Sequence, residues 1–371
     1  MKVAIVINTA WNIYNFRRGI VESLLSKGHQ VLAIAPADDY VERLKALGCD
    51  FRHLSMAGSG INPIKDLILI FRFHRLLRAE RPDVLLSYTI KPNIYGSFLS
   101  RVLKVPIICN VSGLGTVFMR KGVVPAIAMM LYRNSLTHAD LVFFQNDEDQ
   151  ALFVSRVPLQ PTRVQLLNGS GIDLNRFTPR PKPSSSPMTF LMIGRLISEK
   201  GIYEYAEAAA TVKAKYPEAR FQVLGGWDPK DRRAVSKEQL REWQAKDWVE
   251  YLGVTDDVRE QIAQASAVVL PSYREGTPRT LLEAGAMGLP LLATDVPGCR
   301  HVVRDGYNGF LCEAKSGEAL AQIILKFITL SASQQDEMGK NSRTLIEEKF
   351  DERLIVKSYT DAIKKLVQRP N

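Results

Sequence analysis

Residues 268–293 read VVLPSYREGTPRTLLEAGAMGLPLLA and carry the pattern that decides the fold. The apolar run Val268–Leu270 opens the stretch, and a second one, Leu291–Ala293, closes it. Between them, the Thr-Pro pair at 277–278 favours the start of a helix and Gly288 favours its end. Because two strands joined through one helix run parallel in a sheet, the stretch predicts a strand–helix–strand unit.

The same alternation of apolar runs and helical segments extends through the whole chain. Uninterrupted apolar runs are typical of strands that helices cover on both faces of a parallel sheet. The pattern therefore predicts an α/β fold built from doubly wound, Rossmann-like sheets. The expected strands are Val3–Ile7, Val31–Ala35, Val84–Ser87, Ile107–Val111, Leu141–Phe144, Thr189–Ile193, Phe221–Leu224, Val249–Leu252, Val268–Leu270 and Leu291–Ala293, and the expected helices include Gly19–Lys27, Asp39–Leu47 and Lys65–Arg81.

One stretch, Pro179–Pro187, breaks this alternation with the sequence PRPKPSSSP. Such a density of Pro and Ser holds neither a helix nor a central strand, so it predicts an interdomain linker. The expected domains are residues 1–178 and 179–353, and a last helix within residues 354–371 is a candidate to pack back on the first domain. Two doubly wound domains are expected to face a central cleft at the carboxyl ends of their strands, where ligands bind in such folds.

Composition narrows the class of protein. A hydrophobic fraction of 46% provides for packed cores and argues against disorder. The four cysteines are widely spaced, without a CxxC or zinc-ligand pattern, which indicates reduced thiols in a cytoplasmic protein. The apolar run Val3–Ile7 is too short for a signal-peptide core, and Val123–Leu131 is too short to span a bilayer.

The positive charge is concentrated in one half of the chain. Residues 1–180 carry 22 Lys and Arg against 13 Asp and Glu, whereas residues 181–371 carry 27 against 26. The basic half is therefore expected to face an anionic partner, which charge alone leaves open as nucleic acid, a phospholipid surface or a phosphorylated acceptor.

The helix that follows Val268–Leu270 is expected to carry the central chemistry. Its first amides, from Arg279 and Thr280, make an anion site suited to a diphosphate, and Gly276 permits close approach. Thr277 is expected to be the N-cap of this helix and is a further candidate donor-binding residue. Glu275 precedes the helix, and Glu283 lies about 7–8 Å along it. Two carboxylates flanking a diphosphate match a nucleotide sugar, whose hydroxyls lie on both sides of that group.

A second segment, Gly194–Gly201, follows the first strand of the second half. Its Arg195 and Lys200 are placed to reach a diphosphate at that strand's end. Two cations there stabilise the charge that grows on a departing nucleoside diphosphate, a role that a metal otherwise fills. We therefore expect no metal site and no cofactor beyond the nucleotide co-substrate.

These segments resemble the retaining glycosyltransferases of family 4, which have the GT-B fold. The resemblance implies that Glu275 contacts the donor sugar, that Glu283 contacts the ribose, and that Arg195 and Lys200 contact the diphosphate. It also implies that the anomeric configuration is retained without a covalent enzyme intermediate. The matching segments are Gly194-Arg195 with Glu199-Lys200-Gly201, the Glu275 and Glu283 pair, Asn168-Gly-Ser-Gly-Ile-Asp173, Phe177-Thr-Pro179 and Tyr307-Asn-Gly-Phe310.

The acceptor is expected at the first domain. Its first strand-to-helix turn lacks the G-x-G-x-x-G fingerprint, which disfavours a dinucleotide oxidoreductase. Loops at strand ends offer cations for an acceptor phosphate and a glycine turn that lets backbone approach a ligand. The candidate acceptor-binding residues are Arg17, Arg18, Lys91, Asn110, Ser112 and Gly113.

The arrangement Lys91-Pro-Asn-Ile-Tyr-Gly96 followed by Gly113-Leu-Gly115 resembles a bacterial subgroup that extends undecaprenyl-diphosphate-linked saccharides. The resemblance implies a UDP-hexose or UDP-N-acetylhexosamine donor and peripheral attachment at the inner face of the plasma membrane. Two stretches, Lys65–Arg78 and Val117–Leu131, combine apolar residues with cations and are candidates to lie at an anionic bilayer. An ordinary crossover helix remains the alternative for each.

The residues alone leave three other functions open. A glycosyltransferase with a soluble acceptor and a nucleotide-sugar epimerase would use the same two-domain frame. A nucleic-acid-binding protein would use the basic half, but no helix-turn-helix, zinc module or RNP-like strand supports it. Binding of a nucleotide sugar separates the first two from the third, and a shift of random DNA in a gel tests the third.

Overall fold

The computed structural model describes residues 1–56, 62–114, 122–180 and 187–368. The chain forms two compact units. The first contains Met1–Gly171 together with Glu352–Asn371, and the second contains Ile172–Asp351. None of the described helices is long and apolar enough to cross a membrane.

The first unit is built on a seven-stranded parallel sheet with the order β3-β2-β1-β4-β5-β6-β7. The apolar runs of the sequence form its centre, and their side chains are almost completely buried. The strands are β1 (Lys2–Val6), β2 (Gln30–Ala35), β3 (Asp50–His53), β4 (Val84–Tyr88), β5 (Ile107–Val111), β6 (Leu141–Phe144) and β7 (Val164–Leu166).

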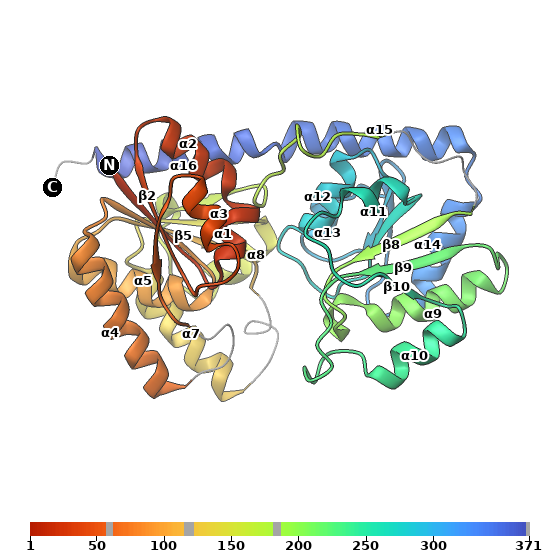
Figure 1. Cartoon of the computed structure of the whole chain (residues 1–371), viewed down its shortest axis with the longest axis horizontal. Coiled ribbons are helices and arrows are strands. Elements are labelled where there is room, and N and C mark those ends of the chain that lie inside the picture. Colours follow the sequence, from red (N-terminus) through yellow and green to blue (C-terminus); the bar gives the residue numbers. More distant parts are fainter. Residues whose placement is uncertain (57–61, 115–121, 181–186, 369–371) are drawn as a thin grey trace. The chain divides into compact units, whose positions relative to one another are not determined.

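Two hydrophobic clusters cover the faces of this sheet. Helices α1 (Ala10–Phe16), α2 (Arg18–Ser26), α3 (Val41–Ala46) and α16 (Glu352–Val367) pack on one face. Helices α4 (Pro63–Glu80), α5 (Ile90–Leu103), α7 (Val123–Leu136) and α8 (Asp147–Val154) pack on the other, where Figure 1 shows α4, α5 and α7.

The second unit repeats this plan on a six-stranded parallel sheet with the order β10-β9-β8-β11-β12-β13. Its strands are β8 (Thr189–Ile193), β9 (Arg220–Leu224), β10 (Glu250–Tyr251), β11 (Ala267–Leu270), β12 (Leu291–Thr294) and β13 (Gly309–Cys312). One face carries α9 (Ile202–Lys213), α10 (Lys237–Ala245) and α14 (Gly317–Ile328). The other carries α11 (Arg259–Gln264), α12 (Arg279–Ala286), α13 (Cys299–Val302) and α15 (Ala332–Lys349), and two 3-10 turns complete the description, η1 (Pro161–Arg163) and η2 (Ser198–Lys200).

The expected α/β class with two Rossmann-like sheets is confirmed, but the expected strands omit the edge strands β3 and β7 of the first sheet and β13 of the second. In β3 and β7 most residues are exposed or half-buried, so neither strand shows the continuous apolar run of a central strand. In the second sheet β10 is a pair of residues, shorter than the expected Val249–Leu252.

The division between the units lies earlier than the expected boundary at Pro179. Ile172 and Phe177 are buried in the second unit's core, and the Ile172 amide donates a hydrogen bond to the Phe350 carbonyl at 2.8 Å. The chain therefore joins the second unit before the Pro-rich stretch, of which residues 181–186 lie outside the described ranges. The last helix, α16, belongs to the first unit and begins at Glu352.

Candidate active site

The predicted donor residues gather at one position of the second sheet, where the strand order reverses. Chain order runs from β8 to β9 and β10 on one side, then returns to β11 on the other. In such sheets the loops after the two central strands diverge and leave room for a ligand at their carboxyl ends. Arg195 and Lys200 follow β8, and Glu275 follows β11.

Lys200 and Glu275 form an ion pair with 2.5 Å between Nζ and Oε1. Both side chains are only partly exposed, at 27% and 13%. Gly201, at φ +77°, holds the loop of Lys200 against β11, because a Cβ there would lie 2.1 Å from the Pro271 carbonyl oxygen. Two loops that are distant in the sequence are thus fixed together, with a cation and a carboxylate between them.

A second glycine positions the loop of Glu275 from the other side. Gly298 has φ +84°, and a Cβ at this residue would lie 2.4 Å from the Gly276 carbonyl oxygen. The Glu275 amide also donates to the Pro297 carbonyl at 3.3 Å. Pro297 and Gly298 were not predicted as part of the site, because a lone Pro-Gly pair after a strand usually marks nothing more than a turn.

The start of α12 differs from the prediction by one residue. Pro278, rather than Thr277, is the N-cap, with extended backbone at φ −73° and ψ 112°. Its carbonyl accepts the amides of Leu281 and Leu282 at 3.1 and 3.3 Å, so the helix begins at Arg279. Pro278 therefore takes the N-cap position that was expected for Thr277. The amides of Arg279 and Thr280 lie in the first turn of the helix, as expected.

Glu283 lies within α12 and pairs with Arg279 one turn earlier, with 3.0 Å between Oε1 and Nε. Burial raises the pKa of the Glu283 carboxyl, and the Arg279 guanidinium opposes that rise. Thr280 anchors the same turn by donating from its hydroxyl to the Ile193 carbonyl, 3.2 Å away at the end of β8. The first turns of α12 are thus tied directly to the strand end that carries Arg195.

Arg195 itself is exposed. Its guanidinium forms no hydrogen bond or ion pair with another residue of the described ranges, whereas Lys200 and Arg279 are both paired. Arg195 therefore presents its positive charge to solvent, beside the two ion pairs. The predicted donor residues therefore lie in a single cluster of charged side chains around the start of α12.

The first sheet reverses its order in the same way, between β1 and β4. A cavity of about 300 Å³ opens there at the carboxyl ends of β1, β4 and β5. Of the six predicted acceptor residues it contains Lys91, Asn110, Ser112 and Gly113, and its remaining lining is Asn8, Met56, Thr89, Ile90, Pro92, Asn93, Val111 and Tyr132.

A hydrogen-bond network holds the polar wall of this cavity. The Ser112 hydroxyl donates to Asn110 Oδ1 at 2.8 Å, and Asn110 Nδ2 donates to the Tyr359 hydroxyl at 2.9 Å. Asn93 Nδ2 donates to the Asn110 carbonyl at 2.9 Å. Tyr359 comes from α16, so the end of the chain helps to position Asn110.

The predicted cations at this sheet edge are largely neutralised or buried. Lys91 pairs with the buried Asp66 at 2.7 Å, so it brings no surplus charge to the cavity. Arg17 is buried, with its guanidinium 4.4 Å from the centre of the Tyr88 ring. Arg18 is more exposed and pairs with Glu22 at 2.7 Å. Neither arginine lines the cavity.

Two lining residues that the sequence analysis missed carry unusual features. Thr89 has φ +67°, a conformation that costs a β-branched residue about 1–3 kcal/mol and tends to occur at functional sites. Its hydroxyl oxygen and Asn93 Oδ1 are buried without a hydrogen-bond partner among the described residues. No sequence signal marks Thr89, because a strained backbone is set by the strand and helix on either side of it. The loop of Gly115 and Thr116 lies outside the described residues.

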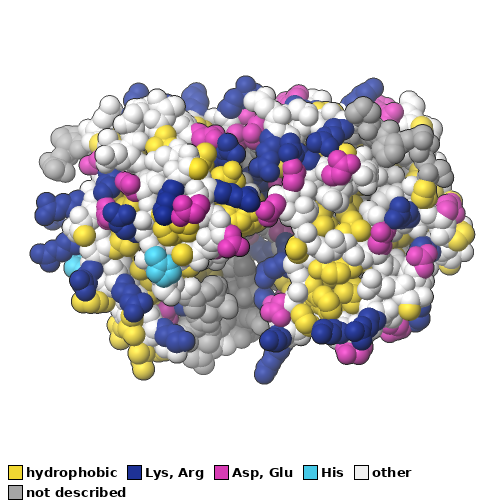
Figure 2. Space-filling model, in the orientation of Figure 1, with side chains coloured by type: hydrophobic (Ala, Val, Ile, Leu, Met, Phe, Trp, Pro, Cys, Tyr) yellow, Lys and Arg dark blue, Asp and Glu magenta, His cyan; other side chains and the backbone are white. Residues whose placement is uncertain are grey.

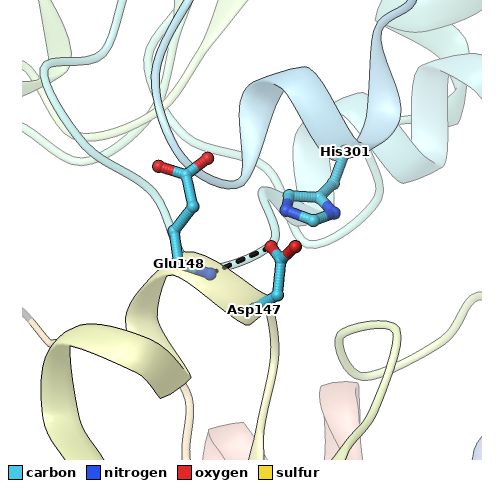
Figure 3. A group of neighbouring side chains, drawn as sticks. All are labelled: Asp147, Glu148 and His301. Carbon is cyan, nitrogen blue, oxygen red and sulfur yellow. Dashed lines mark hydrogen bonds between the residues drawn. The ribbon is translucent and has the colours of Figure 1, made fainter. Parts of the chain in front are cut away.

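No metal site was expected, but one acidic triplet, Asp147-Glu-Asp149, contains carboxylates that could in principle bind a metal ion. Figure 3 shows its first two residues at the start of α8, where the Glu148 amide donates to Asp147 Oδ1 at 2.9 Å. Asp149 is buried, so it is turned away from solvent. His301, also drawn there, belongs to α13 of the second unit. Within either unit taken by itself, the described residues contain no group of three or more His, Cys, Asp or Glu side chains close enough to share an ion.

Both halves of the chain match known protein families. Residues 176–345 match the family described as glycosyl transferases group 1, and residues 15–169 match the glycosyl transferase 4-like domain. The chain is a glycosyltransferase, with a group 1 domain in its second half. The first match contains every residue of the candidate donor cluster, and the second contains all the lining residues of the first unit's cavity except Asn8.

Several curated proteins are similar over most of their length. The N,N'-diacetylbacillosaminyl-diphospho-undecaprenol alpha-1,3-N-acetylgalactosaminyltransferase of Campylobacter jejuni is 28% identical over 87% of this chain and 88% of its own. The UDP-Gal:alpha-D-GlcNAc-diphosphoundecaprenol alpha-1,3-galactosyltransferase of Escherichia coli is 24% identical over 78% of this chain and 77% of its own. The capsular polysaccharide biosynthesis glycosyltransferase CapM of Staphylococcus aureus is 24% identical over 91% of this chain and 90% of its own.

Solved glycosyltransferase structures share the fold. Anabaena HepE in complex with UDP and glucose aligns with a TM-score of 0.82 at 18% identity, over 98% of this chain and 100% of that one. WaaG, a glycosyltransferase involved in lipopolysaccharide biosynthesis, aligns with a TM-score of 0.74 at 18% identity, over 97% and 99%. The expected GT-B fold is confirmed by these neighbours and by the two parallel sheets.

Proposed function

We propose that this glycosyltransferase moves a hexose or N-acetylhexosamine from a nucleotide sugar, with UDP as the nucleotide, to a polyprenyl-diphosphate-linked saccharide. The observation that carries the proposal is the charged cluster around α12. Its Lys200–Glu275 and Arg279–Glu283 pairs place two carboxylates and two cations at the switch point of the second sheet. Carboxylates accept strong hydrogen bonds from sugar hydroxyls, and cations together with helix amides bind a diphosphate.

Each donor group has a role in this proposal. Glu275 accepts hydrogen bonds from hydroxyls of the transferred sugar, and Glu283 accepts them from the ribose. Arg195, Lys200 and the first turn of α12 hold the diphosphate. When the bond between the anomeric carbon and the phosphate oxygen breaks, its electron pair leaves with the nucleoside diphosphate. The same cations stabilise that charge, so the proposed transfer uses no metal.

The stereochemical proposal is retention of the anomeric configuration. The acceptor hydroxyl attacks from the face that the diphosphate leaves, and its proton passes to the departing phosphate oxygen. No protein base is then required. That fits the first unit's cavity, where Asn110 and Ser112 are amide and hydroxyl groups, which donate and accept hydrogen bonds without titrating near neutral pH.

The acceptor class is proposed from the relatives. The printed names of the Campylobacter jejuni and Escherichia coli proteins contain sugars linked to diphospho-undecaprenol or diphosphoundecaprenol. We place an acceptor sugar against Asn110, Ser112 and Gly113 in the first unit's cavity, with Lys91 positioned by Asp66 at its edge. Arg18 remains the exposed candidate for the acceptor phosphate, and buried Arg17 is reassigned to packing against Tyr88.

Because the proposed acceptor is linked to a lipid, the proposed transfer takes place at a membrane. We propose a cytoplasmic protein that binds peripherally to the inner face of the plasma membrane and takes part in bacterial surface-glycan or glycoprotein-glycan assembly. The excess of Lys and Arg in residues 1–180 supports attraction to anionic lipid. Nucleic acid is not a proposed partner.

The decisive experiment is a donor screen by isothermal titration calorimetry with UDP-, GDP- and ADP-sugars. We expect binding of a UDP-sugar, lost in Glu283→Ala, while the variant keeps the circular dichroism spectrum of the parent. Incubation with the bound donor and a lipid-linked saccharide should then yield an extended lipid with retained configuration. Absence of binding to any nucleotide sugar would refute the donor proposal. Conversion of the donor alone to its epimer would replace transfer by epimerisation.

A further inference from the structure

Helix α4 is apolar on two opposite faces, and only one of them is covered. Its inner face packs Leu69, Phe73 and Leu77 into the first unit's core. Its outer face exposes four large apolar side chains, at 72% for Ile64, 67% for Leu67, 45% for Ile68 and 62% for Phe71. Packing against the sheet explains why the inner face is apolar. It does not explain why the outer face is apolar as well.

The exposed residues form one continuous stripe. Positions 64, 67, 68 and 71 follow the spacing i, i+3, i+4 and i+7 that places side chains on one side of a helix. Arg75 and Arg78 continue the same side towards the end of α4. The Arg75 guanidinium lies 5.9 Å from the centre of the Phe71 ring.

The two neighbouring helices extend this surface. Helix α5 packs against both α4 and α7. It exposes Phe98 and Val102, at 53% and 56%, and α7 exposes Ile127 and Met130, at 37% and 55%. Figure 2 shows hydrophobic side chains together with Lys and Arg side chains where α4 lies in Figure 1. We call this surface the α4–α5–α7 face; its exposed apolar residues are Ile64, Leu67, Ile68, Phe71, Phe98, Val102, Ile127 and Met130.

The charge on the α4–α5–α7 face has one sign. The sequences of the three helices contain two acidic residues, Asp66 and Glu80. Asp66 is buried and pairs with Lys91, and Glu80 pairs with Lys2 and Arg52. The exposed cations are Lys65, Arg72, Arg75, Arg78, Arg101 and Arg133.

We propose that the α4–α5–α7 face docks on an anionic bilayer, with α4 lying in the plane of the interface. The stripe of α4 enters the boundary between headgroups and acyl chains, and the flanking arginines contact lipid phosphates. This matches the chemistry of an interfacial helix, which needs both an apolar face and nearby cations. The inference deepens the membrane partner of the proposed function by assigning the surface that meets it.

A second copy of the chain fits this face less well. A symmetric dimer would bring two copies of the same surface together, so the exposed cations of one copy would meet those of the other. No exposed acidic residue on α4, α5 or α7 is available to pair with them. An anionic lipid surface supplies the missing negative charge along with an apolar layer.

The test is flotation of the full chain with vesicles of phosphatidylcholine alone or with one-third phosphatidylglycerol, without donor or acceptor. We expect the parent to float with the anionic vesicles. Leu67→Ser with Phe71→Ser should reduce partitioning about 10-fold or more, because two apolar side chains no longer leave water. Replacing Arg72, Arg75 and Arg78 by Gln should reduce it by roughly 5-fold for each charge at low salt.

Helix α16 provides matched controls on the opposite side of the first sheet. Leu354→Ser with Val367→Ser removes two apolar residues that are 45% and 39% exposed. Replacing the exposed Lys357, Lys364 and Lys365 by Gln removes the same number of charges. Both control variants should float like the parent.

Insertion and electrostatic adsorption are separated by a probe in the stripe. Phe71→Trp should gain emission that brominated acyl chains quench, relative to the parent, which contains four tryptophans elsewhere. The proposal is overturned if the parent does not float, if the stripe variants float like the controls, or if analytical ultracentrifugation shows a dimer that Leu67→Ser with Phe71→Ser dissociates. Donor binding measured by calorimetry should be the same in every stripe variant as in the parent. If the parent itself binds no donor, the donor proposal is refuted and the docking result still stands.

Discussion

At the scale of single residues, the second unit holds its charges in pairs. Lys200 lies 2.5 Å from Glu275, and Arg279 lies 3.0 Å from Glu283. Pairing fixes the direction of each side chain and keeps the carboxylates available as acceptors. A diphosphate that enters beside these pairs meets cations whose positions are already set, which is the arrangement that favours electrostatic stabilisation of a leaving group.

Lys200→Ala tests the leaving-group role. We expect kcat/KM for transfer to fall by about 10²–10³, the range seen when one preorganised donor is removed. The variant should keep its fold, because the pair is part of a surface site and not of the core. Steady-state assays of the released nucleotide measure the effect, with Lys237→Ala, an exposed lysine at the start of α10, as control. Turnover within a few-fold of the parent would remove Lys200 from the mechanism.

Glu283 makes stability depend on pH. Because burial raises the pKa of this carboxyl above its ordinary 4.5, the folded state favours the protonated form. That contribution is complete below pH 4.5 and is lost as the pH rises through the raised value. Glu283→Gln mimics the protonated carboxyl, so its thermal midpoint should exceed that of the parent by more at pH 7 than at pH 4.5. Scanning calorimetry without ligand across this range checks it, and a constant offset would contradict it.

At the scale of elements, loops packed through glycine position the candidate donor site. The Gly298 turn before α13 lies directly against the Glu275–Gly276 backbone, and the Gly201 turn lies against the end of β11. These contacts leave no room for a side chain. The geometry of the charged cluster therefore depends on turns that contribute no charge of their own.

Gly298→Ala should displace the loop of Glu275. A methyl group there would lie 2.4 Å from the Gly276 carbonyl oxygen, so we expect donor affinity to fall at least 10-fold and stability to fall by about 1–3 kcal/mol. Gly306→Ala is the matched control, because Gly306 has a similar φ of +73° but a Cβ added there would have no neighbouring atom within 4 Å. Calorimetric titration of both variants isolates the close contact from the backbone strain. Equal donor affinities in the two would argue against this loop as part of the site.

At the scale of the whole molecule, the end of the chain completes the first unit. Helix α16 follows the second unit in sequence, yet Ile355, Tyr359 and Ile363 are buried in the core of the first. The Tyr359 ring lies 5.0 Å from that of Phe143, and its hydroxyl accepts a hydrogen bond from Asn110. The first unit can therefore be complete only after the second unit and α16 have been synthesised.

Tyr359→Ala should weaken the first unit selectively. Removing a fully buried aromatic side chain costs about 3–5 kcal/mol, and Asn110 would also lose its partner. Hydrogen exchange followed by mass spectrometry should show faster exchange in β1, β4 and β5 and unchanged exchange in β8, β11 and β12. Tyr307→Ala, at an exposed tyrosine of the second unit, serves as control. A uniform increase over both units would show that they unfold as one.

Much of the fold could be predicted, because strands covered on both faces carry continuous apolar runs. β3 and β7 escaped, since edge strands are half-exposed and their pairing depends on a neighbour distant in sequence. The clustering of the candidate donor residues was also predictable, because each of their two segments follows a strand that ends at the same edge of one parallel sheet. The cap at Pro278 was missed by one residue, since backbone geometry chose between two adjacent candidates.

The sequence by itself thus determined the two α/β sheets, the charged segment around α12 and the basic character of the first half. Only the tertiary structure decided that Asp66 neutralises Lys91, that Arg17 is buried on Tyr88, and that α4 leaves one of its two apolar faces exposed. The reason is physical. Local patterns report which side chains prefer burial, but the partner of each charge and the face that a neighbour covers are set by contacts between segments far apart in the chain.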